Sequence, residues 1–265
     1  MEVNCETKLD VIAQWIRGSR RVVIFTGAGV STESGIPDFR SPGGLWDRFD
    51  PNEFLFQKFL ASREVRVNYW KLHTEIYYTI LKAEVNAAHR ACVELERHGV
   101  LDCVITQNID GLHQKAGLPH EKVIELHGNA MKVVCLDCGL TCDRGLIQQR
   151  IENGDVAPVC DSCGGLLKPA TVAFGQPMPY QETLEAENRS RQADVFLAIG
   201  SSLVVYPAAY MPLHAKQAGA KLVIINLSST PYDDIADIIV EGKAGEAMDG
   251  LLKRVYPEAG HDRNK

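Results

Sequence analysis

The chain has 265 residues, of which 45% are hydrophobic and 23% charged, and its formal net charge is −6. This length accommodates one large domain, or one large and one small domain, with ample apolar core. The acidic balance gives no support for direct nucleic-acid binding, and no apolar run is long enough to span a membrane. The first ten residues carry no basic segment followed by an apolar one, so we expect a cytoplasmic protein without a secretion signal.

The N-terminal part of the sequence predicts a helix, a strand and a glycine loop. Residues 7–18 carry apolar residues at helical spacing, and the apolar run 22–25 leads directly into the sequence TGAG at 26–29. A strand that ends in such glycines is typical of a phosphate-binding turn. The third glycine of the usual dinucleotide-binding fingerprint would stand at position 32, which is Thr32. A long polar loop therefore replaces the expected start of the crossover helix.

Further along, residues 52–82 are rich in Phe, Leu, Tyr and Trp without strand alternation, which predicts a helical side module. Asn86 is a suitable N-cap for a following helix. Four more short apolar runs end in polar or glycine-containing turns, at residues 104–105, 123–124, 195–199 and 222–225. Continuous apolar runs that alternate with helices predict an α/β fold with a doubly wound parallel sheet. Ligands of such sheets bind at the carboxyl ends of the strands, so the polar residues there are candidate site residues.

Eight cysteines are present, and four of them form two Cys-x-x-Cys pairs separated by residues 139–159. Each pair presents two thiolates from one tight turn, and Zn²⁺ in structural sites prefers four ligands in a tetrahedron. In a large chain this pattern predicts a metal site rather than a disulfide framework. We expect Cys142 to remain unligated. One structural Zn²⁺ ion is expected on Cys135, Cys138, Cys160 and Cys163.

Several motifs, in a fixed order along the chain, are similar to those of one enzyme family. They are GAGVSTESGIPDFRS at 27–41, TQNIDGLH at 106–113, ELHGN at 125–129, the paired cysteines, and GSSL at 200–203. In these motifs the chain resembles the sirtuins, NAD-dependent protein lysine deacylases, and in particular their short prokaryotic-type members. The resemblance implies a Rossmann-like NAD-binding domain of residues 1–46, 86–130 and 169–265. It also implies a small domain made of a helical module, 47–85, and a zinc-ribbon module, 131–168.

For the chemistry, the resemblance implies His127 as the general base that deprotonates a ribose hydroxyl. Histidine suits this role because its ordinary pKa, about 6.5, lies near neutral pH. Asn108 is implied to orient the ribose or a nearby water, and His113 to support the loop rather than react. The loop 30–46 is expected to cover the ribose while the bond to nicotinamide breaks. The implied NAD contacts are Gly27, Ala28, Gly29, Ser31, Ile36, Asp38, Phe39, Arg40, Trp46, Gln107, Asn108, Ile109, Asp110, Gly200, Ser201, Ser202, Asn226, Leu227, Ser228 and Ala244.

An acyl-lysine peptide is expected to bind by adding as a strand to an edge of the protein. The resemblance places this edge at Val172, Ala173, Phe174 and Gly175. The commoner sirtuin pattern has a second aromatic residue where Ala173 stands and a glutamate where Gln176 stands. Members that prefer succinyl or malonyl groups carry a Tyr-x-x-Arg pair, whereas this chain has Tyr69 followed by Leu72. We therefore expect deacetylation in preference to desuccinylation.

Three functions remain open on this sequence. The first is an NAD-dependent protein lysine deacetylase, which transfers the acyl group to ADP-ribose. The second cleaves NAD in the same way but transfers ADP-ribose to a protein side chain. The third is a non-catalytic NAD- or nucleic-acid-binding module braced by zinc, although acidic residues offset the basic ones in 131–168. His127 and the Phe174-Gly175 edge favour the deacetylase.

Overall fold

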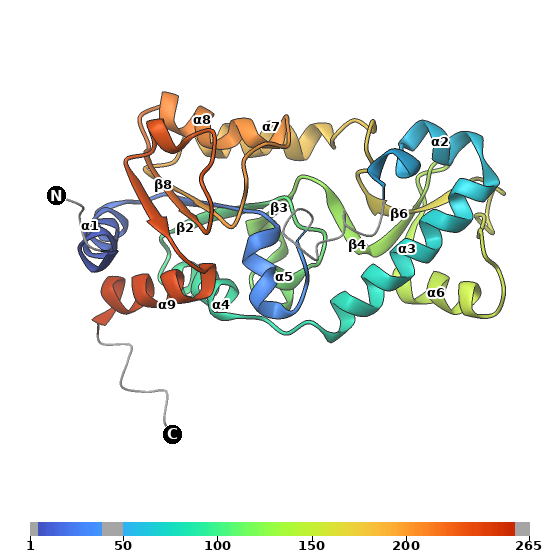
Figure 1. Ribbon diagram of the computed structural model, residues 1–265, viewed down its shortest axis with the longest axis horizontal. Coiled ribbons are helices and arrows are strands. Elements are labelled where there is room, and N and C mark those ends of the chain that lie inside the picture. Colours follow the sequence, from blue (N-terminus) through green and yellow to red (C-terminus); the bar gives the residue numbers. More distant parts are fainter. Residues whose placement is uncertain (1–4, 39–49, 258–265) are drawn as a thin grey trace, which may run out of the picture.

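A parallel β-sheet of six strands forms the centre of the larger module of the protein (Figure 1). The structure is a computed structural model that describes residues 5–38 and 50–257. Each neighbouring pair is parallel. The strands, in spatial order, are β3 (Val123–Glu125), β2 (Leu101–Thr106), β1 (Val22–Thr26), β7 (Val195–Ile199), β8 (Lys221–Asn226) and β9 (Ile238–Glu241). Numbered within this sheet alone, the order is 3-2-1-4-5-6, that of a doubly wound dinucleotide-binding sheet. The predicted fold class is confirmed.

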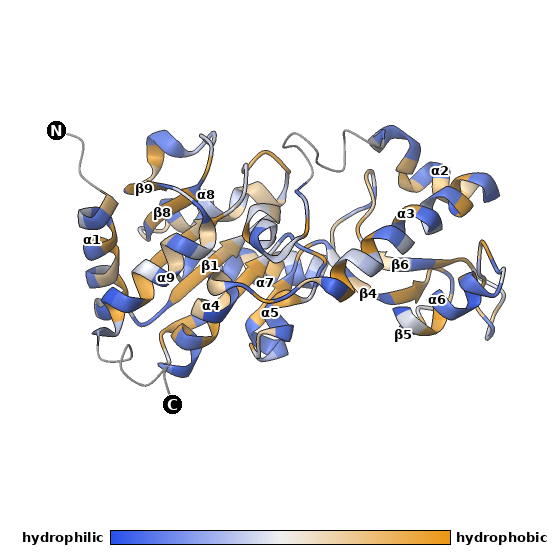
Figure 2. Cartoon of the chain, turned by 60° about the horizontal axis from the view of Figure 1, so that its bottom comes forward, coloured by the Kyte–Doolittle hydropathy of each residue, from blue (hydrophilic) through white to orange (hydrophobic). Residues whose placement is uncertain are grey.

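Helices cover both faces of this sheet because both sets of alternating side chains in its strands are apolar. In β1, Val22 and Ile24 face one core, and Val23 and Phe25 face the other. Figure 2 shows the hydrophobic strands enclosed between helices that carry hydrophilic residues. The first face is covered by α1 (Cys5–Gly18), α4 (Ala87–Arg97) and α9 (Ala244–Val255), the second by α7 (Tyr180–Arg191) and α8 (Met211–Gln217).

The five predicted apolar runs are strands of this sheet, and the predicted helix 7–18 lies within α1. Asn86 caps α4 as predicted, since its side-chain oxygen accepts from the backbone N–H of Ala88 at 2.9 Å. The sheet also contains β9, which the sequence did not predict. This edge strand has only four residues, and Asp237 interrupts the apolar pattern directly before it.

The smaller module lies at the other end of the long axis of the molecule (Figure 1). Its helices are α2 (Phe56–Ala61), α3 (Arg63–Lys82) and α6 (Arg144–Glu152), and its antiparallel sheet has the order β5-β4-β6. These strands are β4 (Gly128–Cys135), β5 (Thr141–Asp143) and β6 (Leu167–Thr171). Segments far apart in the sequence therefore form one module. The division of the chain into domains stays a prediction, and the small sheet itself continues to Thr171.

Among the helices of residues 5–38 and 50–257, none is both long and apolar enough to cross a membrane. Short helical segments connect the elements of the two modules. The short segments are η1 (Ala28–Ser34), η3 (Pro51–Phe54), α5 (Leu112–Lys115), η4 (His120–Lys122), η5 (Ala208–Tyr210) and η6 (Asp233–Ile235).

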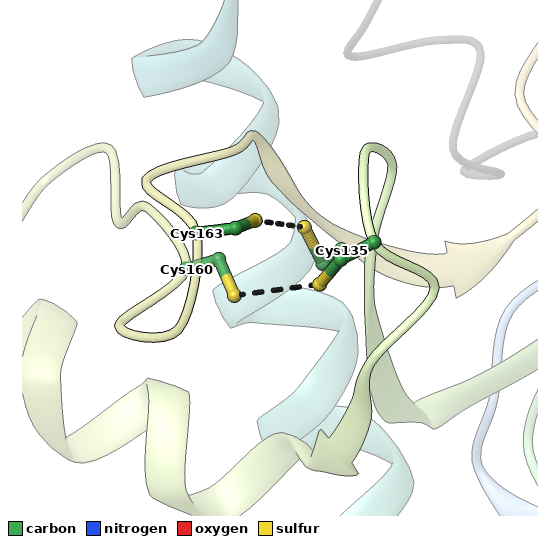
Figure 3. A group of neighbouring side chains, drawn as sticks. Cys135, Cys160 and Cys163 are labelled. Atoms are coloured by element: carbon green, nitrogen blue, oxygen red, sulfur yellow. Dashed lines mark hydrogen bonds between the residues drawn. The ribbon is translucent and has the colours of Figure 1, made fainter.

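The four cysteines of the two pairs lie together where β4 ends (Figure 3). Their Sγ atoms are all within 4.8 Å of one another. Cys135 Sγ is 3.6 Å from Cys163 Sγ, and Cys138 Sγ is 3.9 Å from Cys160 Sγ. Four Zn–S bonds of about 2.3 Å in a tetrahedron require sulfur atoms roughly 3.8 Å apart. The residues therefore fit a structural Zn²⁺ ion with no open position, and Cys142 is outside the group.

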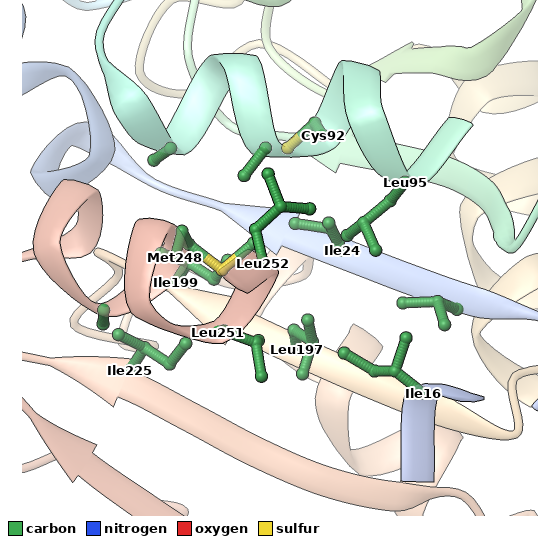
Figure 4. Close-up of a cluster of buried hydrophobic side chains, with 14 of the residues drawn as sticks. Ile16, Ile24, Cys92, Leu95, Leu197, Ile199, Ile225, Met248, Leu251 and Leu252 are labelled. Atoms are coloured by element: carbon green, nitrogen blue, oxygen red, sulfur yellow. The ribbon is translucent and has the colours of Figure 1, made fainter. Parts of the chain in front are cut away.

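The core on the α9 side of the large sheet generates a stability prediction. Leu251 is 1% exposed and packs among residues of the helices and strands shown in Figure 4. We expect Leu251→Ala to lower the free energy of unfolding by about 2–5 kcal/mol, because it leaves a cavity. Urea denaturation followed by circular dichroism measures this loss. Lys253→Ala, on the exposed side of the same helix, is the control and should change the value by less than about 0.5 kcal/mol.

The cysteine geometry generates a second prediction. The purified protein should contain one zinc ion per chain, and Cys160→Ser should lose it and unfold at a lower temperature, because zinc binding contributes to folding free energy. Metal analysis and thermal denaturation measure the two effects. Cys142→Ser is the matched control and should retain the metal. Full zinc occupancy in Cys160→Ser would contradict a site of four thiolates.

Candidate active site

Two glycine loops meet at the carboxyl ends of β1 and β7, where the strand order of the sheet reverses. Gly29 N donates to Gly200 O at 2.8 Å. A Cβ atom on Gly27 or Gly29 would lie 2.8 Å from backbone atoms of Gly200. Gly200 has a φ of +60°, and a Cβ there would lie 2.4 Å from Val30 N. Only glycine permits this approach, which leaves backbone rather than side chains facing a ligand at the switch point of the sheet.

Asn108, two residues after the end of β2, connects the first glycine loop to a buried carboxyl group. Its Nδ2 donates to Gly27 O and to Ser31 Oγ, both at 3.1 Å. Ser31 Oγ in turn donates to Asp110 Oδ2 at 2.7 Å. Burial raises the pKa of Asp110, while hydrogen bonds from Leu112 N and Ser31 act in the opposite sense. Four predicted site residues are therefore joined in one hydrogen-bonded group.

Gln107 links the second glycine loop to His127. Its Nε2 donates to Ser201 Oγ at 2.8 Å, and its carbonyl oxygen lies 3.0 Å from His127 Nδ1. A carbonyl oxygen only accepts, so Nδ1 carries the ring proton and Nε2 has the free lone pair. Burial lowers the pKa of His127, although the hydrogen bond to Gln107 acts in the opposite sense. The imidazole is therefore neutral at neutral pH and able to accept a proton at Nε2.

The predicted adenosine side lies around the end of β8. Asn226 Nδ2 donates to Ser228 O at 2.8 Å, and Asn226 O accepts from Gly242 N at 3.1 Å. Leu227, between the two polar residues, is 63% exposed. Ala244 begins α9 two residues after Gly242. These predicted contacts therefore gather at the ends of two adjacent strands, β8 and β9.

The other predicted cofactor residues adjoin these groups along the chain. Ile36 N donates to Ser31 O at 3.3 Å, and Ile109 O accepts from Ala130 N at 2.8 Å. Half-buried positions are occupied by Ala28, Asp38 and Ser202. The predicted contacts of Phe39, Arg40 and Trp46 lie outside the described residues.

Sequence reasoning missed two buried threonines behind the site. Thr26 Oγ1 donates to Thr106 Oγ1 at 2.9 Å, and Thr106 Oγ1 accepts from Asn108 N at 3.0 Å. Thr26 Oγ1 also lies 3.1 Å from Nε2 of the buried His113. Each threonine is the last residue of its strand, a position where polar residues are site candidates, but neither was singled out by name from the sequence. They hold the main chain of Asn108 in place.

A further residue that the sequence did not single out is Glu33. Its Oε2 accepts from Gly245 N at 2.7 Å, in the first turn of α9. A carboxylate at this position satisfies a free backbone N–H and interacts favourably with the helix dipole. Glu33 therefore joins the opening loop to the C-terminal helix on the adenosine side of the site.

The predicted substrate edge is attached to both modules. Val172 N donates to His127 O at 2.9 Å, so the first residue of the edge is bonded to the main chain of the candidate base. On the other side, Phe56 N donates to Phe174 O at 2.9 Å. Ala173 is buried in the apolar cluster of the small module, whereas Phe174 is 45% exposed. The edge thus lies between His127 and the helical module.

Comparison with known proteins identifies relatives along nearly the whole chain. A model of the Sir2 family matches residues 27–207. A protein of Thermodesulfovibrio yellowstonii named NAD-dependent protein deacetylase is 43% identical over 258 residues, which are 97% of this chain and 99% of that protein. The NAD-dependent protein deacetylase 1 of Bradyrhizobium diazoefficiens is 48% identical over 239 residues, 90% of this chain and 91% of that protein.

Solved Sir2 structures have the same architecture. One, described as Sir2 with p53 peptide and NAD⁺, has a TM-score of 0.82 at 39% identity and covers 94% of this chain and 98% of its own. Another is a Sir2 variant with deacetylated p53 peptide and 3′-O-acetyl ADP ribose. It has a TM-score of 0.85 at 38% identity and covers 95% of this chain and 98% of its own. Since the family model matches more than half of the chain and the relatives match it almost end to end, the protein is a member of the Sir2 family.

Proposed function

We propose that this Sir2-family protein is an NAD-dependent protein lysine deacetylase. It releases nicotinamide and transfers the acyl group of an acyl-lysine side chain to ADP-ribose, and deacetylated lysine and O-acetyl-ADP-ribose are the products. The observation that carries the proposal is His127. Its Nδ1 is held by the Gln107 carbonyl, its main chain is bonded to the substrate edge, and Gln107 also contacts the second glycine loop.

The residues at the ends of the strands fit NAD. A Cβ atom on Gly27 or Gly29 would collide with the backbone of Gly200, so the two loops meet through backbone alone. In the proposal, the backbone N–H groups of these loops bind the pyrophosphate. In the proposal, Gln107 and Asn108 hold the nicotinamide ribose, and Asp110 and Ile36 hold the carboxamide of nicotinamide. Asn226, Leu227, Ser228 and Ala244 hold the adenosine. When bound, NAD supplies a ribose carbon that becomes electrophilic as its bond to nicotinamide breaks.

The acyl oxygen of a lysine amide is a weak nucleophile, so much of the catalysis must come from positioning. Well-oriented groups contribute up to about 7–11 kcal/mol in favourable intramolecular reactions. Here the edge 172–175 orients the peptide, and Ser31, Asn108 and Asp110 orient the other reactant through their mutual hydrogen bonds. The loop 30–46, with Phe39, Arg40 and Trp46, is proposed to exclude water from the ribose.

His127 has the properties that a general base requires at this place. The Gln107 carbonyl fixes the tautomer, so Nε2 is the atom that accepts the proton of a ribose hydroxyl. Burial keeps the pKa of His127 below its ordinary value of 6.5. The imidazole of His127 is therefore neutral at neutral pH. We expect the rate of deacetylation to fall only when the pH drops below 6.5.

The proposed substrate is an acyl-lysine in an extended peptide that adds as a strand to Val172, Ala173, Phe174 and Gly175. Backbone pairing of this kind gives affinity with little demand on the peptide sequence. The small module attaches to the edge through Phe56 N, and Gln57 Nε2 donates to Gly175 O at 3.2 Å. We place the enzyme in the cytoplasm as part of this proposal.

The proposed function is tested by mass spectrometry of an acetyl-lysine peptide incubated with NAD and the protein. We expect equal amounts of nicotinamide, deacetylated peptide and O-acetyl-ADP-ribose. His127→Ala should lower the rate of deacetylation by about 10²–10⁴-fold, as loss of a general base does. His120→Ala, at an exposed position, is the matched control and should retain wild-type activity. Nicotinamide release with ADP-ribose attached to protein would instead support the ADP-ribosyltransferase alternative, and no NAD consumption would support a non-catalytic module.

The preference of the enzyme between acetyl and succinyl groups is predicted from Tyr69 and Leu72. Leu72 is 8% exposed and lies in the apolar cluster with Tyr69, Phe54 and Phe59, and Lys71 is exposed. Leu72 offers no charge to a carboxylate, so we expect an acetylated peptide to have at least a tenfold higher kcat/KM than its succinylated counterpart. Faster turnover of the succinylated peptide would contradict this. Leu72→Arg tests whether the missing charge is the cause, because it should narrow the difference in kcat/KM between the acetylated and the succinylated peptide.

A further inference from the structure

Lys168 in β6 is a buried lysine that the proposed mechanism does not use. It is 1% exposed, and its Nζ donates to Pro169 O at 3.1 Å and also to Thr171 O. The Nζ atom also lies over the ring of Tyr69, 5.6 Å from its centroid. A buried amino group needs hydrogen-bond acceptors to offset its lost hydration. The two carbonyl oxygens and the ring supply them, so the contacts of Lys168 are specific to the end of β6.

The two carbonyl groups belong to the part of β6 where its pairing with β4 is irregular. Val133 is paired with Pro169, and Gly128 with Thr171, so four residues of β4 lie opposite one residue of β6. At this place the two strands approach closely, since a Cβ atom on Gly128 would lie 2.0 Å from a main-chain oxygen of β6. Regular hydrogen bonds between the two strands therefore do not hold this segment of β6 in position. The Lys168 ammonium group bonds to both sides of it.

The residues that follow this segment form the substrate edge. Thr171 is paired with Gly128, the residue after His127, and Val172 N donates to His127 O at 2.9 Å. A shift of the Thr171 carbonyl therefore moves the first residue of the edge and the main chain of the base together. Thr171 is also in contact with Tyr69, whose pKa burial raises to about 12 despite the hydrogen bond with Thr171. The hydroxyl of Tyr69 is thus protonated at neutral pH.

We propose that Lys168 is a positioning residue that sets the geometry of the substrate-peptide edge through the carbonyl groups of Pro169 and Thr171. This inference rests on the proposed function, because it assigns the edge to an acyl-lysine peptide. Burial lowers the pKa of Lys168 to about 7. Both the ammonium and the neutral amine carry enough N–H groups to reach two carbonyls, so the role does not depend on one charge state.

A purely structural lysine predicts a different result from a positioning lysine. If Lys168 only stabilises the small module, its loss lowers the melting temperature, while the folded variant keeps its affinity for the peptide. If Lys168 positions the edge, the KM for the peptide rises and the KM for NAD stays the same, because the glycine loops belong to the other module. The KM values for the two substrates therefore separate the two roles.

The test compares Lys168→Met, which is close in size but cannot donate, with Lys168→Arg, which can. Lys132→Met is the matched control, because Lys132 is an exposed lysine on β4 of the same sheet. With an acetyl-lysine peptide we expect Lys168→Met to raise the peptide KM at least tenfold and to leave the NAD KM within twofold. Lys168→Arg should have a peptide KM close to that of wild type, and Lys132→Met should have the wild-type KM for both substrates. Unchanged peptide KM in folded Lys168→Met overturns the inference.

Two further measurements keep the inference testable if Lys168→Met fails to fold or wild type proves inactive. Lys168→Gln keeps an N–H donor group but on a shorter side chain, so it should give an intermediate rise in peptide KM, and a wild-type value would overturn the inference. Hydrogen exchange of residues 172–176 needs no activity. Their amides should exchange at least tenfold faster in Lys168→Gln, while Leu166, bonded to Asp137, stays unchanged. Faster exchange with an inactive wild type would refute the proposed function alone, and equal exchange would refute the role of Lys168.

Discussion

The hydrogen bond from Gly29 N to Gly200 O is the contact on which the rest of the site depends. It joins the ends of β1 and β7, the two parallel central strands from which the halves of the sheet extend to opposite edges. A side chain on either loop would separate them, because a Cβ atom would lie within 2.8 Å of the facing backbone. With the loops in contact, Ser201 reaches Gln107, and Gln107 holds His127. The lack of a side chain at Gly29 and Gly200 thus contributes to the placement of His127, the proposed base.

The site is otherwise held by many ordinary hydrogen bonds rather than by one strong interaction. The bonds from Thr26 to Thr106 and from Asn108 to Ser31 each contribute only about 0.5–1.5 kcal/mol, and the bond from Ser31 to the Asp110 carboxylate contributes about 1.5–3 kcal/mol. All are buried, however, so breaking one leaves a polar group without water or partner, which costs more than the bond contributes. The arrangement is therefore rigid without being unusually stable. Rigidity of this kind suits a mechanism in which positioning supplies much of the rate.

The sequence was sufficient for the strands with continuous apolar runs and for the cysteine pairs. These features depend on local pattern: a buried parallel strand must be apolar on both faces, and two ligands from one turn need fixed spacing. It was insufficient for β9, whose four residues depend on β8 for pairing, and for the bond between Glu33 and Gly245. It also gave no sign that Lys168 is buried, since its contact with Tyr69 depends on the packing of β6 against α3. Contacts between segments far apart in the chain carry no local signal.

The departures from the common sirtuin pattern at the proposed substrate edge are compatible with the hydrogen bonds and apolar contacts that hold its main chain. Gln176 Oε1 accepts from Ala173 N at 3.1 Å, a bond that needs only a side-chain oxygen of this length, which glutamate would supply equally. The substitution therefore removes a charge and keeps the turn. Ala173 lacks the aromatic ring of the common pattern, but it is buried beside Phe54 and Phe59 of the helical module, which supply apolar contacts there. In the proposed mode of binding the peptide pairs with backbone groups, so an edge whose main chain is held in this way should tolerate both changes.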